Sequence, residues 1–131
     1  MERKILFKAK KLSDGKWVKG DLLHKGNKTY IYSPHINDKG FYVENEEVDP
    51  FTVCQFTGLK DEDGKDVWEH DILNIVMNTV EYEVVSLYGA WQLINSIERM
   101  PINDLKITIN DYLVCWKVVG NKFDRKVRND K

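Results

Sequence analysis

The chain has 131 residues, a length that fits one compact domain or two small ones sharing a core. Hydrophobic residues make up 42% of it, with 4 Trp, 6 Tyr and 5 Phe, so the composition argues against disorder of the whole chain. No apolar stretch has the form of a secretory signal or the roughly 18 residues of a membrane span, so we expect a soluble cytoplasmic protein without a membrane partner.

The formal net charge is only −1, but the charges are unevenly placed along the chain. Residues 1–28 hold nine Lys or Arg against three acids, a net +6, whereas residues 44–71 hold two lysines against ten acids, a net −8. Residues 122–131 return to five basic against two acidic residues, a net +3. Such polarity can guide a charged partner, pair opposite faces of neighbouring subunits, or reflect only solvated faces.

Turn signals occur at short intervals in the first half of the chain. Each contains a residue that tolerates positive φ: Asp14-Gly15, Gly26-Asn27, Lys39-Gly40 and Asp63-Gly64. Between them lie short runs rich in aromatic and β-branched residues, which suit a pleated sheet. We therefore expect a meander of hairpins with strands at Ile5–Lys10, Lys16–His24, Thr29–Ser33, Gly40–Glu44 and Thr52–Phe56.

The second half of the chain has more regular strand patterns. From Val80 onward Val80, Tyr82 and Val84 fall on one face of a strand and Glu81 and Glu83 on the other, which is the period of a half-buried strand. A bend at Tyr88-Gly89 would let the next strand pair back across it. We expect the remaining strands at Asp71–Met77, Ala90–Ile94 and Leu113–Val119.

The segment between residues 96 and 110 fits two interpretations. Leu105, Ile107 and Ile109 alternate as in a strand, but Ile102, Leu105 and Ile109 also have helical spacing. Pro101 is suited to the first turn of a helix. We favour one short helix or helical turn near Pro101–Lys106.

Closely spaced short strands without long helices argue for a barrel or sandwich rather than alternating βα units. We predict a mainly β fold of antiparallel hairpins, forming a small SH3-like or otherwise partly open barrel with at most one short helix. The 131 residues are expected to form a single domain. Within it, residues 1–54 are rich in hairpins, residues 55–121 form a compact barrel-like part, and residues 122–131 are a basic tail.

The two cysteines, Cys54 and Cys115, are far apart and lie in apolar, strand-like surroundings. In a protein that is not exported, such thiols are more often buried small hydrophobic residues than a disulfide. A zinc site needs four ligands, and no Cys-x-x-Cys or His pair supplies them. We therefore expect no metal and no cofactor.

The central segment, residues 48–72, reads VDPFTVCQFTGLKDEDGKDVWEHDI. It resembles the signature of the YopX family, V-D-P-x-T-V-x-Q-[FY]-T-G-L-x-D-x-x-G followed by a Tyr-Glu-Gly-Asp-Ile-Val-like strand start. Further matches span nearly the whole chain: Ile5–Ala9 with Gly15–Val18, Ala90-Trp91, and Val118–Asn121. The resemblance implies a mostly β protein of a bacteriophage or prophage, and it supplies no activity that can be transferred.

Two positions depart from the family pattern. His70 stands where the family usually has Gly, so this turn must accommodate a side chain. After Gly120-Asn121 the chain has Lys122-Phe123-Asp124 in place of the family's Tyr-Glu-Asn-Pro, which bears on how the tail packs.

Two short polar segments form a candidate functional corner, composed of Gln55, Thr57, Gly58, Glu69, His70 and Asp71. A ligand could use the polar groups beside Gly58, but a fixed bend with positive φ needs the same residues. Paired carboxylates beside a histidine suit proton transfer or a cation, whereas a carboxylate at a strand entrance also commonly holds a turn. The neighbouring acids Asp61–Asp63 do not follow the EF-hand order, and we interpret them as a solvated hairpin tip.

No nucleophile motif and no phosphate-binding glycine loop is present in the sequence, so we expect a non-enzymatic protein. Our first hypothesis is a phage or prophage accessory protein that contacts a phage or host protein, or forms a homo-oligomer. The alternative is nucleic-acid binding by the basic, aromatic N-terminal region, through charge and stacking. The residues expected to contact nucleic acid are Lys8, Lys10, Lys11, Lys16, Trp17 and Lys19.

Overall fold

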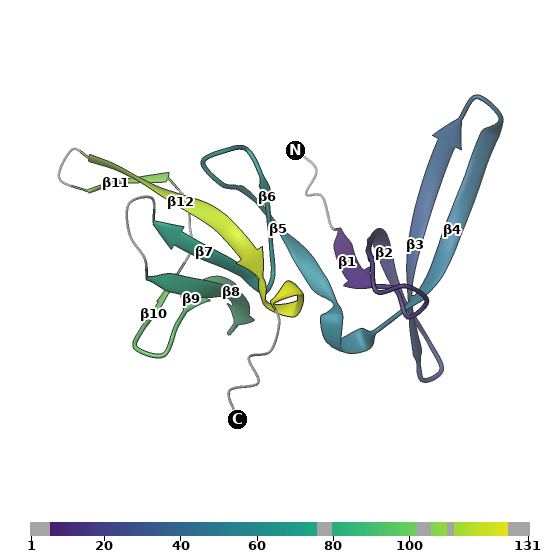
Figure 1. Cartoon of the computed structure of the whole chain (residues 1–131), viewed down its shortest axis with the longest axis horizontal. Coiled ribbons are helices and arrows are strands. Elements are labelled where there is room, and N and C mark those ends of the chain that lie inside the picture. The colour runs from purple at the N-terminus through teal and green to yellow at the C-terminus, as the bar shows by residue number, and fades with distance from the viewer. Residues whose placement is uncertain (1–5, 76–79, 102–105, 110–111, 126–131) are drawn as a thin grey trace. The chain divides into compact units, whose positions relative to one another are not determined.

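The computed structural model describes residues 6–75, 80–101, 106–109 and 112–125. Across these residues the chain is mainly β, with two antiparallel sheets and no helix of seven residues or more (Figure 1). The predicted fold class of antiparallel hairpins is therefore confirmed, and neither sheet closes into a barrel within the described residues.

No helix within the described ranges is both long enough and apolar enough to cross a membrane.

The chain divides into two compact units, Met1–Phe56 and Thr57–Lys131. One sheet has the strand order β4-β3-β2-β1-β5-β6, and the other has the order β10-β9-β8-β7-β12-β11. Strand β5 begins in the first unit and ends in the second. The elements that begin in the first unit are β1 (Phe7–Lys10), β2 (Trp17–Lys25), β3 (Lys28–Asn37), β4 (Gly40–Val48), the 3-10 helix η1 (Pro50–Thr52) and β5 (Cys54–Lys60).

Strands β3 and β4 are longer than their sequence patterns predict, because Pro34 interrupts the strand signal without ending the strand. Strand β3 pairs with β2 only as far as Tyr32, but with β4 as far as Asn37. Proline lacks the N–H that a central strand needs, and it is tolerated where a strand has an open edge. The two strands therefore form a long hairpin that extends beyond β1 and β2 (Figure 1).

The core of the first unit is small. It is centred on Ala9, Ile31 and Val48, which are at most 1% exposed, with partly buried side chains from neighbouring strands against them. Gly20 allows β2 and β3 to approach closely, since a Cβ atom there would lie 1.9 Å from the backbone oxygen of Tyr32. Cys54 is buried, as predicted for a small hydrophobic residue, and its thiol donates to the Thr52 oxygen at 3.3 Å, whereas the side chain of Cys115 lies outside the described set.

The second unit contains seven further strands and one 3-10 helix among the described residues. They are β6 (Asp66–Trp68), β7 (Asp71–Ile75), β8 (Glu81–Leu87), β9 (Ala90–Ile94), β10 (Arg99–Pro101), β11 (Lys106–Ile109), β12 (Tyr112–Asn121) and the 3-10 helix η2 (Lys122–Asp124). The expected helix near Pro101–Lys106 is wrong at both of its ends. Pro101 pairs with Gln92 in a hairpin and Lys106 pairs with Cys115, so cross-strand pairing prevails over the helical spacing, and residues 102–105 lie outside the description.

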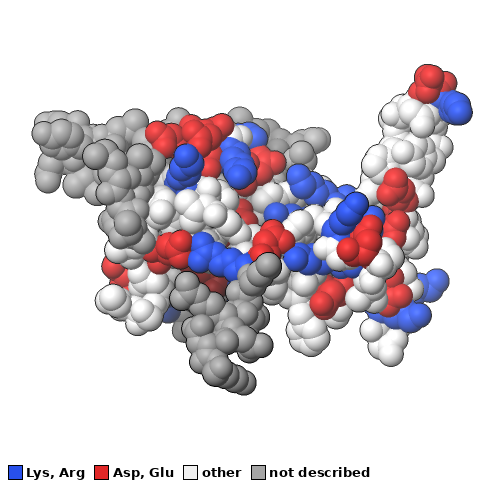
Figure 2. All heavy atoms as spheres, in the orientation of Figure 1, with Lys and Arg blue, Asp and Glu red and all other residues white. Residues whose placement is uncertain are grey.

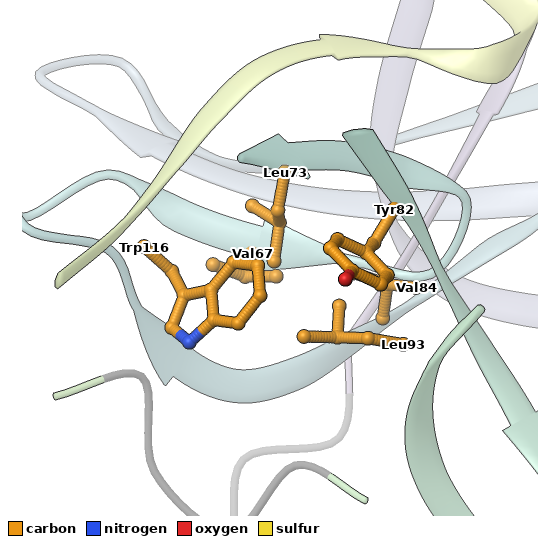
Figure 3. Packing of buried hydrophobic residues seen from close by; sticks show 6 residues of the cluster. All are labelled: Val67, Leu73, Tyr82, Val84, Leu93 and Trp116. Atoms are coloured by element: carbon orange, nitrogen blue, oxygen red, sulfur yellow. The ribbon is translucent and has the colours of Figure 1, made fainter. Parts of the chain in front are cut away.

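Alternating strand residues build the larger core of the second unit. Side chains from five strands point toward one another there (Figure 3): Val67, Leu73, Tyr82, Val84, Leu93 and Trp116. The rings of Tyr82 and Trp116 meet edge to face with centroids 5.4 Å apart, a favourable aromatic geometry. The alternation predicted from Val80 is confirmed at Tyr82 and Val84, which are buried while Glu81 is exposed, but Val80 itself, just before β8, is 43% exposed.

Candidate functional site

The segment Gln55–Gly58 forms a bend in β5. Gly58 has a φ of +83°, the positive value expected from the sequence, and a Cβ atom there would meet nothing within 4 Å. Glycine is therefore required by the backbone conformation and not by lack of space. The buried Thr57 hydroxyl donates to the Val67 oxygen at 2.7 Å and accepts from the Leu59 N–H at 3.1 Å, so it holds the β5–β6 hairpin. Gln55 pairs with Phe7 of β1.

Asp71 lies at the start of β7 and is only 3% exposed. Its Oδ2 accepts the N–H of Trp68 at 2.8 Å, which closes the turn across residues 69 and 70. Its Oδ1 accepts from the side-chain amide of Asn121 at 2.9 Å, which joins this turn to the end of β12. The carboxylate thus satisfies one donor from its own turn and one from the end of β12, which lies 50 residues further along the chain.

His70 occupies the turn with a φ of +70°, a conformation that side chains rarely adopt. Its N–H donates to the oxygen of Val84 at 2.7 Å, and its own oxygen accepts the N–H of Lys122 at 2.9 Å. The backbone of the turn is therefore bonded on both sides, which stabilises a histidine where the family pattern has glycine.

The His70 imidazole lies between two carboxylates. Its Nδ1 is 2.7 Å from Oε2 of Glu83, and its Nε2 is 3.8 Å from Oε2 of Glu69. Because an ionised carboxylate only accepts, Nδ1 is the donor to Glu83. The Phe123 ring packs edge-on at 5.1 Å, and Lys122 Nζ lies 4.0 Å from the Glu83 oxygen.

The three candidate residues of this turn do not converge on one point. Glu69 and His70 interact, but Asp71 is directed to Trp68 and Asn121. None of the described contacts of His70 is to a hydroxyl or thiol that it could activate as a nucleophile. Among the described residues, no group of three or more His, Cys, Asp or Glu side chains could hold a metal ion. Glu83 could not be identified as part of this site from the sequence, because its contact with His70 depends on how β7 and β8 pair.

Asp61 corrects the interpretation of residues 61–63 as a solvated tip. It is 3% exposed, and its Oδ1 accepts the N–H groups of Asp63 and Lys65, both at 2.9 Å. Its Oδ2 accepts the N–H of Val118 at 3.0 Å. A single carboxylate therefore holds the β5–β6 turn and ties it to β12, while Glu62 and Asp63 are exposed.

The N-terminal hairpin gathers most of the residues expected to contact nucleic acid. In the β1–β2 register Lys8 pairs with Lys19 and Lys10 with Trp17, which places the four side chains on one face. The Nζ atoms of Lys8 and Lys10 lie 4.5 and 5.4 Å from the centroid of the Trp17 ring, within cation–π range.

Lys11 and Lys16 flank the adjoining turn and are held by Asp14. The N–H of Lys16 donates to Asp14 Oδ1 at 2.9 Å, and Lys11 Nζ lies 3.3 Å from Oδ2. These contacts, the hydrogen bond from Lys16 above all, hold the pKa of Asp14 below its usual value. Asp14 thus partly neutralises the Lys11 ammonium, whereas it holds Lys16 through the backbone.

The outer part of the β3–β4 hairpin, which we call the arm (residues 32–45), presents apolar side chains on one face. Cross-strand pairing sets Ile36 opposite Phe41 and Pro34 opposite Val43, with Tyr32 one step further along the same face. Ile36 is 83% exposed and Phe41 67%, and the other three are also exposed. Between its charged tip and the acidic residues nearer its base, the arm is uncharged in Figure 2. We call these five residues the apolar stripe.

The opposite face of the arm differs in character. There the rings of His35 and Tyr42 stack with centroids 4.9 Å apart, and His35 Nε2 lies 3.6 Å from Glu44. The sequence did not predict the apolar stripe, because Pro34 marks the end of the expected strand Thr29–Ser33, and β3 continues to Asn37. The Lys39-Gly40 turn would have fixed the register, and with it the shared face of Ile36 and Phe41.

Comparison with known protein families places the chain in one of them. The family model described as YopX protein matches residues 6–126, which is nearly the whole chain. The match contains the central signature over residues 48–72, whose Thr57, Gly58, Asp61 and Asp71 hold turns in the structure. No curated protein matches the chain. The chain therefore belongs to the YopX family.

Proposed function

We propose that this protein is a non-enzymatic accessory protein of a bacteriophage or prophage, acting in the cytoplasm of the bacterial host through contacts with other proteins. The apolar stripe of the arm carries the proposal. Contiguous exposed apolar patches on soluble proteins mark interaction sites, whereas single exposed apolar residues need no explanation. Burying one such side chain contributes about 1.5–3 kcal/mol, so a partner that covers the stripe gains substantially.

The arm also needs a partner for physical reasons. A two-stranded ribbon is marginally stable in water unless a third strand or another layer covers it. Strand β3 pairs with β2 only as far as Tyr32, so the arm beyond that point has two strands among the described residues. A protein surface laid against the stripe would supply the missing layer.

The charge of the hairpin favours a protein partner over nucleic acid at this surface. From Lys28 to Val48 it carries two lysines against four acids, a net charge of −2. Because phosphate backbones are attracted by positive charge, an acidic ribbon is unsuited to a nucleic-acid groove.

The proposal is tested by affinity capture from infected or induced host cells with the wild-type protein and with Ile36→Thr/Phe41→Thr. Threonine keeps the β propensity of the strands while it removes most of the apolar surface. The matched control is Ile97→Thr/Phe51→Thr, which makes the same changes at residues that are 86% and 85% exposed outside the arm. We expect the stripe variant to lose partners that the control retains. Identical capture by all three proteins would contradict the proposal.

Nucleic-acid binding by the N-terminal hairpin is the second candidate. The observation that favours it is the shared face of Lys8, Lys10, Trp17 and Lys19, because cations beside an aromatic ring suit a single strand by charge and stacking. Fluorescence anisotropy with labelled single- and double-stranded oligonucleotides at about 50 mM salt tests it. Binding that Trp17→Ala weakens on single strands supports this candidate, and no binding at low salt removes it.

A further inference from the structure

We infer that the apolar stripe is the contact surface of a homodimer, in which the arms of two copies pack stripe against stripe about a two-fold axis. This inference rests on the proposed function and names the partner as a second copy of the chain. It is carried by the stripe's position, by the charges at its two ends and by its area.

The stripe forms ordered rows along the arm. The row nearest the tip is Ile36 with Phe41, the central row is Pro34 with Val43, and the next row toward the base begins with Tyr32. Large side chains thus lie on both sides of a central row of smaller ones. When two such faces meet about a two-fold axis, the central rows lie against each other and the large side chains pack around them.

The charges beyond the stripe are arranged so that the surface complements itself. The tip carries Asp38 and Lys39, one charge of each sign. On the face of the stripe, the base of the hairpin carries Lys28 and Glu47, whose Nζ and Oε1 atoms are 4.0 Å apart, while Glu44 and Glu46 lie on the opposite face. Each end of the stripe therefore has one acidic and one basic residue. Whether the two arms of a dimer run parallel or antiparallel, opposite charges can then face each other across the interface. An isologous contact requires such self-complementarity, since each patch meets its own copy.

Pairing of two copies through the edges of β4 is disfavoured by the same reasoning. Strand β4 carries Glu44, Glu46 and Glu47 within four residues. Two antiparallel β4 strands side by side would bring these carboxylates into cross-strand positions, where like charges are destabilising. Acidic residues along an exposed edge are a common protection against such pairing. The stripe, which carries no charge, has no such obstacle.

The area of the stripe fits a weak dimer. Five exposed side chains at on the order of 100 Å² each give about 500 Å² per copy, or about 1,000 Å² for the pair, the lower limit of specific interfaces. Such contacts are transient, and we expect half of the chains to be in dimers at about 10–100 µM protein.

Sedimentation velocity across a concentration series tests the inference. We expect the purified wild-type protein and the Ile97→Thr/Phe51→Thr control to shift from monomer to dimer over the same range. Ile36→Thr/Phe41→Thr should raise the dissociation constant at least about tenfold, because it removes apolar area from both copies. Circular dichroism and thermal unfolding of each variant check that the fold is kept.

A charge exchange in the central row tests stripe-to-stripe contact directly. Val43→Lys alone and Val43→Glu alone should both remain monomeric, because like charges meet at the centre of the dimer. An equimolar mixture of the two should form the dimer again, since the introduced charges are then opposite.

The outcomes separate this inference from the proposed function. A wild-type protein that stays monomeric at several hundred micromolar overturns the inference, as do stripe variants that dimerise as the wild type does. If capture from host cells still depends on the stripe in that case, the proposed function stands and the partner is a different protein. If neither capture nor dimerisation depends on the stripe, both fail.

Discussion

Replacing Asp71 by alanine separates a structural role of this carboxylate from a role in a functional corner. The substitution removes the acceptor for the Trp68 N–H and the acceptor for the Asn121 amide, both within buried hydrogen bonds. A buried donor left without a partner costs about 1–3 kcal/mol, so the two together cost about 2–6 kcal/mol of unfolding free energy. That is a large fraction of the stability of a domain of this size.

Urea unfolding followed by tryptophan fluorescence measures this cost, because Trp68 and Trp116 are buried in the second unit. A loss of this size lowers the midpoint by about 1–3 M urea. The matched control is Asp63→Ala, which removes an exposed carboxylate of the same region, 3.5 Å from Lys117. We expect this control to lie within about 0.5 kcal/mol of the wild type.

An Asp71→Ala protein as stable as Asp63→Ala would contradict the structural role of the Asp71 carboxylate. It would mean that the two hydrogen bonds contribute nothing to the fold. If such a protein also lost its contacts in the host cell, Asp71 would belong to a functional site instead.

Three further predictions concern stability. Gly20→Ala should lower the free energy of unfolding by about 1–3 kcal/mol, because the added Cβ atom would lie 1.9 Å from the Tyr32 oxygen. An unchanged midpoint of urea unfolding would contradict this close approach of β2 and β3. Gly58→Ala should cost about 1 kcal/mol or more through its φ of +83° alone, whereas Gly58→Asn, which tolerates this conformation better, should cost less. The hydrogen bonds of Arg125 lower the pKa of Glu81, so the pair stabilises the fold above the ordinary glutamate pKa and this contribution is lost as the pH falls through the lowered value. The free energy of unfolding of the wild type should therefore exceed that of Glu81→Gln by about 0.2–1 kcal/mol at pH 7, and this difference should be lost at about pH 3. Thermal unfolding at both pH values measures it. An equal difference at both pH values would contradict a stabilising role of the Glu81–Arg125 pair.

Turn chemistry and alternation made most of the strands predictable from the sequence. Ala90–Ile94 was predicted with the bounds that β9 has in the structure, because a glycine bend precedes a short apolar run. The expected β3 and β4 ended too early at Ser33 and Glu44, since a proline inside a strand pattern is tolerated only where one edge is open. Which edge is open depends on the pairing of all the strands, and a local pattern does not contain that information.

Side-chain roles were harder to predict than strands. Asp61 and Asp71 are both acids beside a turn, and nothing in their local sequence distinguishes a solvated carboxylate from one that holds backbone N–H groups. The difference comes from β12, which brings Val118 to Asp61 and Asn121 to Asp71 from more than 45 residues away. Likewise, Glu83 reaches His70 only because β8 pairs with β7.

Amide hydrogen exchange of the arm as a function of protein concentration tests the central claim most directly. If two copies cover the apolar stripe, exchange at residues 35–43 should slow as the protein concentration is raised through the range of dimer formation. The amides of Leu73 and Val84 in the core of the second unit should exchange at the same rate throughout. Arm amides that exchange equally fast at every concentration would contradict the account.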